Sequence, residues 1–208
     1  MAAGFATGVR AVLWDADGVL QHGPADWRAD LDAVDGPRFA DAVLAAEGPA
    51  LRGEQPLRDA LQRVLRAWPG ATVDVEDLLP LWEQAVVDRE ALLLVDQVRA
   101  SGVTCALATN QHDVRRAWMR DTLRLDPHFD AVYYSCELGT VKPEPAFFGR
   151  MLADLGLRPT EVGFVDDSPA NVEGARAAGL RAVRHDPASG APALRAEVHA
   201  LVTGASPA

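Results

Sequence analysis

From Arg89 onward, short apolar runs alternate with stretches of helical periodicity, and this alternation constrains the fold more than any other feature of the chain. Strands that alternate with helices form a mostly parallel sheet with helices on both faces. An earlier apolar run, residues 10–14, predicts one more strand of this sheet. The expected fold class is therefore α/β, with a doubly wound, mostly parallel sheet. The expected strands cover residues 10–14, 103–108, 131–134, 162–165 and 180–183, and the expected helices cover residues 92–100, 112–120, 145–155, 169–178 and the alanine-rich tail from Ser189.

Residues 21–89 have a different pattern, with apolar side chains at helical spacing and no convincing strand. One helix is expected around residues 39–46, ending at Gly48-Pro49. We therefore expect two domains: an α/β core domain formed by residues 1–20 and 90–208, and a small helical domain, residues 21–89, inserted after the first strand. The two apolar sets that indicate further helices are Leu57, Leu61, Val64, Leu65 and Trp68, and Leu78, Leu81, Trp82, Ala85 and Val86.

The composition limits the kinds of partner. The chain has 208 residues and a formal net charge of −10, so nucleic acid and membrane surfaces are not expected as partners. A small phosphorylated substrate remains compatible, because a bound cation can reverse the local field. The first ten residues do not resemble a signal peptide, and no apolar run approaches the ~20 residues of a membrane span. Neither Cys105 nor Cys136 has a second ligand-type residue at metal-site spacing, so we expect a cytoplasmic protein without a cysteine metal site.

Four clusters of polar residues are candidates for chemistry. Each alone has a structural explanation: a turn, a helix cap, a solvated loop or a helix N-terminus. Taken together, they fall on one edge of the expected sheet, where several carboxylates repel each other unless a cation lies between them. Hard oxygen ligands of this kind suit Mg²⁺. The clusters are Asp15 with Asp17, Thr109 with Asn110, Lys142, and Asp166 with Asp167.

Lys142 and the segment at Thr109-Asn110 complete this picture. We expect Thr109-Asn110 to stand at the start of a helix, where free backbone N–H groups and a hydroxyl group favour a phosphate. Lys142 adds a positive point charge. The clusters therefore predict a site for Mg²⁺ and a phosphate ester.

The chain resembles the haloacid dehalogenase superfamily over nearly its whole length. Residues 14–20, with Asp-Ala-Asp-Gly after an apolar strand, are similar to the family's first motif, and residues 107–110 to its second. Residues 141–147 carry the lysine of the third motif, and residues 164–171 carry the acidic pair of the fourth. The motifs stand in the family's order. The inserted helical block has the position of the family's helical cap of the first type, over a Rossmann-like core.

This resemblance implies a Mg²⁺-dependent phosphohydrolase. Asp15 is then the nucleophile that forms an aspartyl-phosphate, and Asp17 the general acid and base. The implied metal ligands are Asp15, Asp17 through its carbonyl group, Asp167, and Asp166 directly or through water. Thr109, Asn110, Lys142 and Gly18 are the implied phosphate-binding residues.

Three alternatives remain at this point. Halide-releasing members of the family lack an acid two residues after the nucleophile, so Asp17 makes a haloacid dehalogenase the minor interpretation. A phosphomutase uses the same two aspartates and must keep water out of the site. A catalytically silent relative would act only as a binding protein. A small helical cap favours a small phosphorylated metabolite, such as a sugar phosphate or nucleotide, and leaves open whether the protein is a monomer or a homodimer.

Several other residues receive structural interpretations. Trp27, Trp68 and Trp82 are expected in the core of the helical block, and His22 at a hinge. His112 is expected as an exposed residue of a first helical turn. Arg115 and Arg116 are expected on a solvated helix face, where one of them could pair with an acidic neighbour. Asn171 is expected to hydrogen-bond a metal ligand or a metal-bound water.

Overall fold

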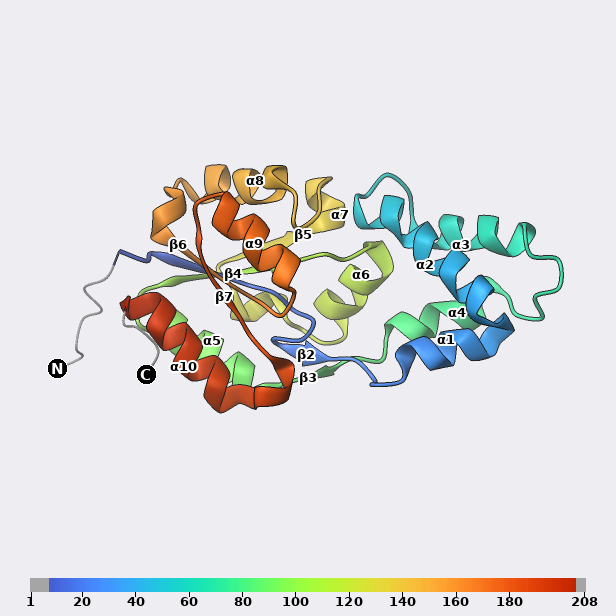
Figure 1. Cartoon of the computed structure of the whole chain (residues 1–208), viewed down its shortest axis with the longest axis horizontal. Helices are drawn as coiled ribbons and strands as arrows, with labels where there is room; N and C mark the ends of the chain where they lie inside the picture. Colours follow the sequence, from blue (N-terminus) through green and yellow to red (C-terminus); the bar gives the residue numbers. More distant parts are fainter. Residues whose placement is uncertain (1–7, 205–208) are drawn as a thin grey trace.

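A five-stranded sheet forms the centre of the protein, in the order β5-β4-β1-β6-β7 (Figure 1). The structure, a computed structural model, describes residues 8–204. Every neighbouring pair of strands is parallel. This confirms the predicted sheet, with strand ends that differ from the expected ones by at most one residue. The strands are β1 (Ala11–Trp14), β4 (Thr104–Thr109), β5 (Ala131–Tyr134), β6 (Val162–Asp166) and β7 (Arg181–Arg184).

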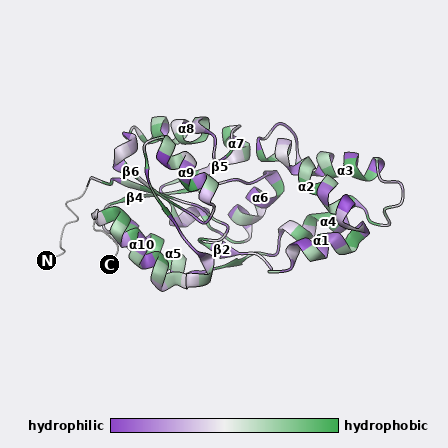
Figure 2. Cartoon of the chain, viewed as in Figure 1, coloured by the Kyte–Doolittle hydropathy of each residue, from purple (hydrophilic) through white to green (hydrophobic). Residues whose placement is uncertain are grey.

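Both faces of the sheet are buried under helices. In β1, Ala11 and Leu13 join one apolar cluster, while Val12 and Trp14 join the other. Because successive side chains point to opposite faces, a strand covered on both sides is apolar throughout, which explains the uninterrupted apolar runs of the sequence. Figure 2 shows hydrophobic residues along the strands and mixed colours on the surrounding helices. One face is covered by α5 (Arg89–Ala100), α6 (Asp113–Asp121) and α10 (Gly190–Thr203), and the other by α8 (Pro145–Leu155) and α9 (Pro169–Ala177).

A separate group of helices lies beyond one end of the sheet (Figure 1). We call residues 27–82 the helical unit. It has its own apolar core, in which Trp82 is buried and Trp68 packs edge-on against Phe39 at 5.7 Å between ring centroids. The expected packing of the tryptophans is confirmed. The unit comprises α1 (Trp27–Asp35), α2 (Pro37–Leu51), α3 (Leu57–Arg66), α4 (Val75–Leu78) and the 3₁₀ turn η1 (Leu79–Trp82).

Two short strands connect the helical unit to the sheet. β2 (Gln21–His22) pairs antiparallel with β3 (Val86–Val87), and the N–H group of Asp88 donates to the carbonyl oxygen of Leu20 at 2.8 Å. The expectation of no strand in residues 21–89 was therefore wrong, as was the helical assignment of Ala85 and Val86. Two-residue strands are too short to show an alternating pattern, and they form because the two crossings of the chain lie side by side.

Helix α2 continues past its expected end. It includes Gly48 and Pro49 and ends after Leu51, and Gly53 adopts a φ of +68°. Proline lacks the N–H group for one helical hydrogen bond, so the sequence favoured an end at Gly48-Pro49. The helix nevertheless continues for two residues, and Ala50 is buried in the core of the helical unit.

The turn between α2 and α3 rests on the sheet domain. Arg52 forms an ion pair with Glu144, and the N–H group of Leu57 donates to Asp113 Oδ1 at 2.9 Å. A Cβ atom on Gly53 would overlap the carbonyl oxygen of Cys136, in the short helix α7 (Ser135–Leu138). The helical unit therefore contacts the rest of the protein at this turn as well as through β2 and β3.

Within residues 8–204, no helix is long and apolar enough to cross a membrane. Seven of the ten N-terminal residues on which the signal-peptide expectation rests lie outside the described range.

Candidate active site

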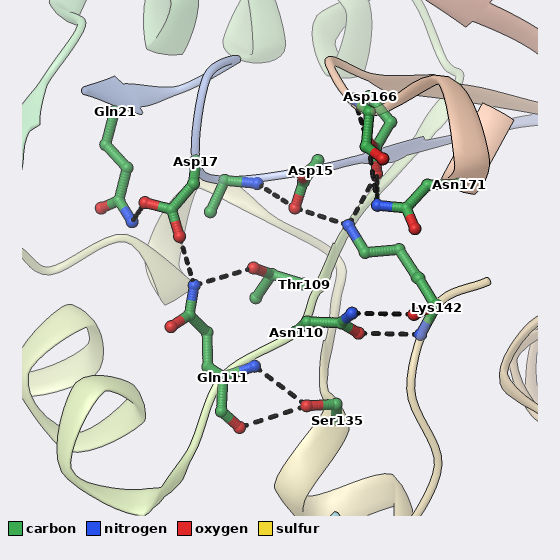
Figure 3. A network of polar contacts seen from close by, with 12 residues as sticks. Asp15, Asp17, Gln21, Thr109, Asn110, Gln111, Ser135, Lys142, Asp166 and Asn171 are labelled. Carbon is green, nitrogen blue, oxygen red and sulfur yellow. Dashed lines mark hydrogen bonds and ion pairs between the residues drawn. The ribbon is translucent and has the colours of Figure 1, made fainter. Parts of the chain in front are cut away.

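Three neighbouring strands end at the candidate site (Figure 3). Asp15 directly follows β1, Thr109 is the last residue of β4, and Asp166 is the last residue of β6. All three side chains are buried. Because β4 and β6 flank β1 in parallel, their carboxyl ends meet at one edge, as the sequence predicted.

Lys142 reaches this edge from the loop before α8. Its Nζ atom lies 2.6 Å from Asp15 Oδ1 and 2.7 Å from Asp166 Oδ2, and its side chain is 1% exposed. The carboxamide of Asn110 holds the loop, because it donates to the carbonyl oxygen of Lys142 at 3.0 Å and accepts from its N–H group at 2.8 Å. The side chain of Asn110 is thus bound to the backbone of Lys142, and its predicted contact with phosphate stays a prediction.

The carboxylates of Asp15, Asp166 and Asp167 form a compact acidic group. One oxygen atom of each lies within 4.8 Å of the others. Oxygens bound to one Mg²⁺ at about 2.1 Å lie up to about 4.2 Å apart, so the group fits this ion with small movements. Asp166 also accepts from the N–H group of Ser168 at 2.8 Å and from Asn171 Nδ2 at 3.0 Å. Asp167 is only half-buried, so its carboxylate is more accessible to a metal ion than those of Asp15 and Asp166.

Burial and neighbouring charges shift the acid–base properties of this group. Burial raises the pKa of Asp15 to about 8, although the ion pair with Lys142 opposes the shift. The pKa of Asp167 is also raised, by burial and by the negative charge of Asp166. Burial alone would lower the pKa of Lys142, but its two carboxylate partners outweigh burial and raise it. Three acidic groups against one lysine leave excess negative charge, which a divalent cation would balance.

Asp17 lies beside this acidic group and is held by three donors (Figure 3). Gln21 Nε2 donates to its Oδ1 atom at 2.9 Å, and Gln111 Nε2 donates to its Oδ2 atom at 2.7 Å. Arg115 Nη2 donates to Oδ1 at 2.6 Å. The side chain of Asp17 is still 48% exposed, so it faces open space as well as its partners.

Gly18 packs against the acidic group. Its φ is +76°, and a Cβ atom at this position would lie 2.6 Å from Asp167 Oδ2. Only glycine fits this backbone conformation and this close approach without strain. Its N–H group donates to the carbonyl oxygen of Gln21 at 2.9 Å, so the predicted contact of Gly18 with phosphate stays a prediction.

Three sequence expectations around β4 were wrong. The helix after β4 begins at Asp113, with His112 as its N-cap, and does not start at Thr109-Asn110. His112 is 1% exposed, because its Nδ1 atom accepts from the N–H group of Arg115 at 3.2 Å and its ring packs edge-on against Trp82. Burial lowers the pKa of His112 to about 4. Arg115 is only 12% exposed and so does not lie on a solvated face, whereas Arg116 does and pairs with Glu137. The ion pair of Arg115 with Asp17 agrees with the expectation that one of the two arginines could pair with an acidic neighbour.

Gln21, Gln111 and Arg115 are the site residues that the sequence did not indicate. Gln111 follows Thr109-Asn110 at a strand end and could have been included on that ground; its Nε2 atom also contacts Thr109 Oγ1 at 3.1 Å. Gln21 and Arg115 carry no such signal, because their contacts with Asp17 depend on how β2 and α6 pack.

A cavity of about 370 Å³ lies between the helical unit and the strand ends. Its wall on the sheet side includes Asp17, Gln111 and Arg115. Its wall on the other side includes Trp27, Glu47 and Trp82. The cavity therefore gives a small molecule access to Asp17.

Comparisons with known proteins agree with this architecture. A family model described as haloacid dehalogenase-like hydrolase matches residues 9–179. The chain is 28% identical over 198 residues to bifunctional epoxide hydrolase 2 of Mus musculus, covering 83% of this chain and 35% of that protein. It is 31% identical over 192 residues to phosphoglycolate phosphatase 1 of Pseudomonas aeruginosa, covering 83% of this chain and 67% of that protein.

A solved structure shares the fold. It is a HAD family enzyme from Bacteroides thetaiotaomicron in complex with magnesium and inorganic phosphate, with a TM-score of 0.72 and 21% identity, covering 85% of this chain and 93% of that one. The family match spans most of the chain, which therefore belongs to the haloacid dehalogenase-like hydrolases. The chain spans about a third of the length of the mouse relative.

Proposed function

We propose that the protein is a Mg²⁺-dependent phosphohydrolase that cleaves a small phosphomonoester through an aspartyl-phosphate on Asp15. The observation that carries this proposal is the position of Asp15 at the end of the central strand, with Lys142 Nζ 2.6 Å away and the carboxylates of Asp166 and Asp167 beside it. The similarity to a phosphoglycolate phosphatase supports a phosphate ester as substrate.

Mg²⁺ would be held by the carboxylates of Asp15 and Asp167 and by the backbone carbonyl group of Asp17. Asp166 would contribute directly or through water, since Lys142, Ser168 and Asn171 already occupy much of its carboxylate. The ion would supply positive charge that lets an anionic phosphate approach carboxylates.

In the first step, a carboxylate oxygen of Asp15 attacks the phosphorus atom, and the bond from phosphorus to the leaving oxygen breaks. Asp17 donates a proton to that oxygen as the alcohol departs. In the second step, Asp17 takes a proton from a water molecule that attacks the phosphoryl group, which frees phosphate and restores Asp15. Lys142 and Thr109 hold phosphoryl oxygens, and Asn110 and Gly18 are the further proposed phosphate-binding residues.

We propose that residues 21–89 form a cap domain over a core domain of residues 1–20 and 90–208. The cavity between the helical unit and the strand ends supports this division. Its volume suits a small leaving group, so a small phosphorylated metabolite is the proposed substrate. We propose that hinge motion takes place at residues 17–24, which include β2, and at residues 88–91, which follow β3.

The test is hydrolysis of para-nitrophenyl phosphate with and without Mg²⁺, by the wild type and by Asp15→Asn. We expect release of nitrophenol only with the metal, and a loss of at least about 1,000-fold in Asp15→Asn because the nucleophile is removed. Asp154→Asn, a change outside the candidate site that also removes one carboxylate, is the matched control and should retain activity.

Activity that persists in Asp15→Asn, in protein free of contaminating phosphatase, would exclude Asp15 as the nucleophile. If the wild type hydrolyses neither this ester nor a panel of small phosphate esters, the protein is a phosphomutase or a silent binding protein. Release of halide from a 2-haloacid without phosphatase activity would favour the dehalogenase.

A further inference from the structure

We propose that Arg115 is a positioning residue that directs the carboxyl group of Asp17 towards the leaving group. The proposal rests on the phosphohydrolase function above and adds a residue to it. Arg115 stands in the first turn of α6, on the sheet side of the cavity that Asp17 also lines.

The guanidinium group of Arg115 joins two parts of the protein. Its Nη2 atom donates to Asp17 Oδ1 at 2.6 Å, and its Nη1 atom donates to the carbonyl oxygen of Trp82 at 3.1 Å. Trp82 ends the 3₁₀ turn of the helical unit, whereas Asp17 follows the central strand. The two arms of one planar group therefore fix Asp17 relative to the wall of the cavity.

Arg115 is the only charged one of the three side chains that donate to Asp17. Gln21 and Gln111 contribute neutral amide donors, whereas the guanidinium group of Arg115 adds the attraction between two opposite charges to its hydrogen bond. The side chain of Asp17 is 48% exposed, so packing alone does not fix its rotamer. Arg115 is itself 12% exposed, with its guanidinium carbon 5.8 Å from the ring centroid of Trp118, and is held in place. Without Arg115, the side chain of Asp17 would adopt other rotamers, and its carboxyl group would no longer be directed towards the leaving group.

A misplaced general acid affects substrates unequally. An alkoxide is a poor leaving group and needs a proton from Asp17 as it departs, whereas para-nitrophenolate leaves without one. The ratio kcat/KM reports the first chemical step, in which Asp17 acts as the acid. A purely structural defect would lower kcat/KM for every substrate by the same factor.

The experiment compares Arg115→Met with Arg116→Met on benzyl phosphate and para-nitrophenyl phosphate, two esters of similar size. Arg116 is the matched control, because it is the next residue of α6 and pairs with Glu137 on the outer face. For Arg115→Met we expect kcat/KM to fall about 100-fold with benzyl phosphate and less than about threefold with para-nitrophenyl phosphate. For Arg116→Met we expect changes of less than about twofold with both esters.

Arg115→Lys provides a second variant and covers the case in which Arg115→Met does not fold, as judged by its melting curve. A lysine keeps the charge but cannot reach Asp17 and Trp82 with two parallel donors. Arg115→Lys should show a smaller loss of kcat/KM than Arg115→Met, again with benzyl phosphate and not with para-nitrophenyl phosphate. Equal losses on the two esters, or no loss, in folded variants would overturn the positioning role. A wild type that hydrolyses neither ester would instead count against the phosphohydrolase function itself.

Discussion

Glu47 places a carboxyl group in a largely apolar wall of the cavity. Trp82 Nε1 donates to its Oε1 atom at 2.7 Å, and Leu44 and Leu51 line the same wall. Burial raises the pKa of Glu47 to about 7, against the opposing effects of the Trp82 hydrogen bond and the charge of Arg115. The folded protein therefore favours the neutral form of this side chain.

This shift makes stability depend on pH in a definite direction. Below pH 4.5, the ordinary pKa of the group, Glu47 is neutral in both the folded and the unfolded state. Between pH 4.5 and about 7, Glu47 is ionised in the unfolded state but still neutral in the folded state, so the free energy of unfolding falls as the pH rises. Above about pH 7, Glu47 is ionised in both states, and the free energy of unfolding falls no further on its account.

Glu47→Gln keeps the acceptor oxygen for Trp82 and cannot ionise. We expect the variant to match the wild type near pH 4.5 and to exceed it by about 1–3 kcal/mol in free energy of unfolding at pH 8. Urea unfolding at the two pH values measures this difference. Glu83→Gln, at an exposed glutamate next to Trp82, controls for the loss of one charge. Equal effects of the two substitutions at pH 8 would contradict the prediction.

At the level of single residues, the sequence indicated those that stand at the ends of strands. Asp15, Thr109 and Asp166 lie there because parallel strands end together, and this follows from strand assignment alone. Arg115 and Gln21 were missed, since their partner Asp17 is brought to them by the packing of separate elements. His112 was assigned to the surface because its burial depends on Trp82, thirty residues earlier in the chain.

Among the elements, the turn between α2 and α3 has the strictest steric demand. Gly53 has a positive φ, and its missing Cβ atom leaves the room that the carbonyl oxygen of Cys136 occupies. The contact presses the helical unit onto α7 and positions the ion pair of Arg52 with Glu144 nearby. That ion pair, with a hydrogen bond from Thr140, lowers the pKa of Glu144 to about 2.

Gly53→Ala should separate the turn from α7. We expect a loss of about 2–4 kcal/mol in free energy of unfolding, from the left-handed backbone and the overlap together. Amide exchange in residues 49–57 should become faster. The control is Gly149→Ala in α8, where nothing lies within 4 Å of the added Cβ atom and where alanine should stabilise the helix by about 0.5–1 kcal/mol. A Gly53→Ala variant as stable as the wild type would show that the turn moves freely.

The elements that were assigned well are those whose pattern is local. The buried strands agree with their expected ranges, and so does α8, which begins at Pro145 and ends just before Gly156. The strands β2 and β3 were missed because each pairs only with the other, and residues 23–85 separate them in the chain. The end of α2 was misplaced because tertiary packing of Ala50 outweighs the local preference of Pro49.

For the molecule as a whole, charge is the prominent feature. The net charge is −10, and the acidic group at the strand ends concentrates part of it in a buried place. We expect Mg²⁺ to stabilise the fold: at one hundred times its dissociation constant, a ligand that binds only the folded state adds about 2.7 kcal/mol. For a chain of this length that corresponds to a rise in Tm of roughly 5–10 °C.

Melting curves with and without Mg²⁺, and after addition of a chelator, measure this effect. Asp167→Asn should largely remove the rise, because it deletes the most available carboxylate of the group. Glu90→Gln, which removes a carboxylate from the first turn of α5 outside the acidic group, should leave the rise intact. A Tm unchanged by Mg²⁺ in the wild type would contradict a metal site formed by Asp15, Asp166 and Asp167.

The hydrogen bond between Asp88 and Leu20 has a consequence for how such a protein can diversify. The chain leaves the sheet domain and returns to it at neighbouring points, so the intervening segment imposes no spacing on the strands. An insert of different length or sequence can replace it during evolution without changing the distance between Asp15 and Lys142. For the proposed phosphohydrolase, we therefore expect substrate preference to vary with the insert while the residues at the strand ends keep the chemistry.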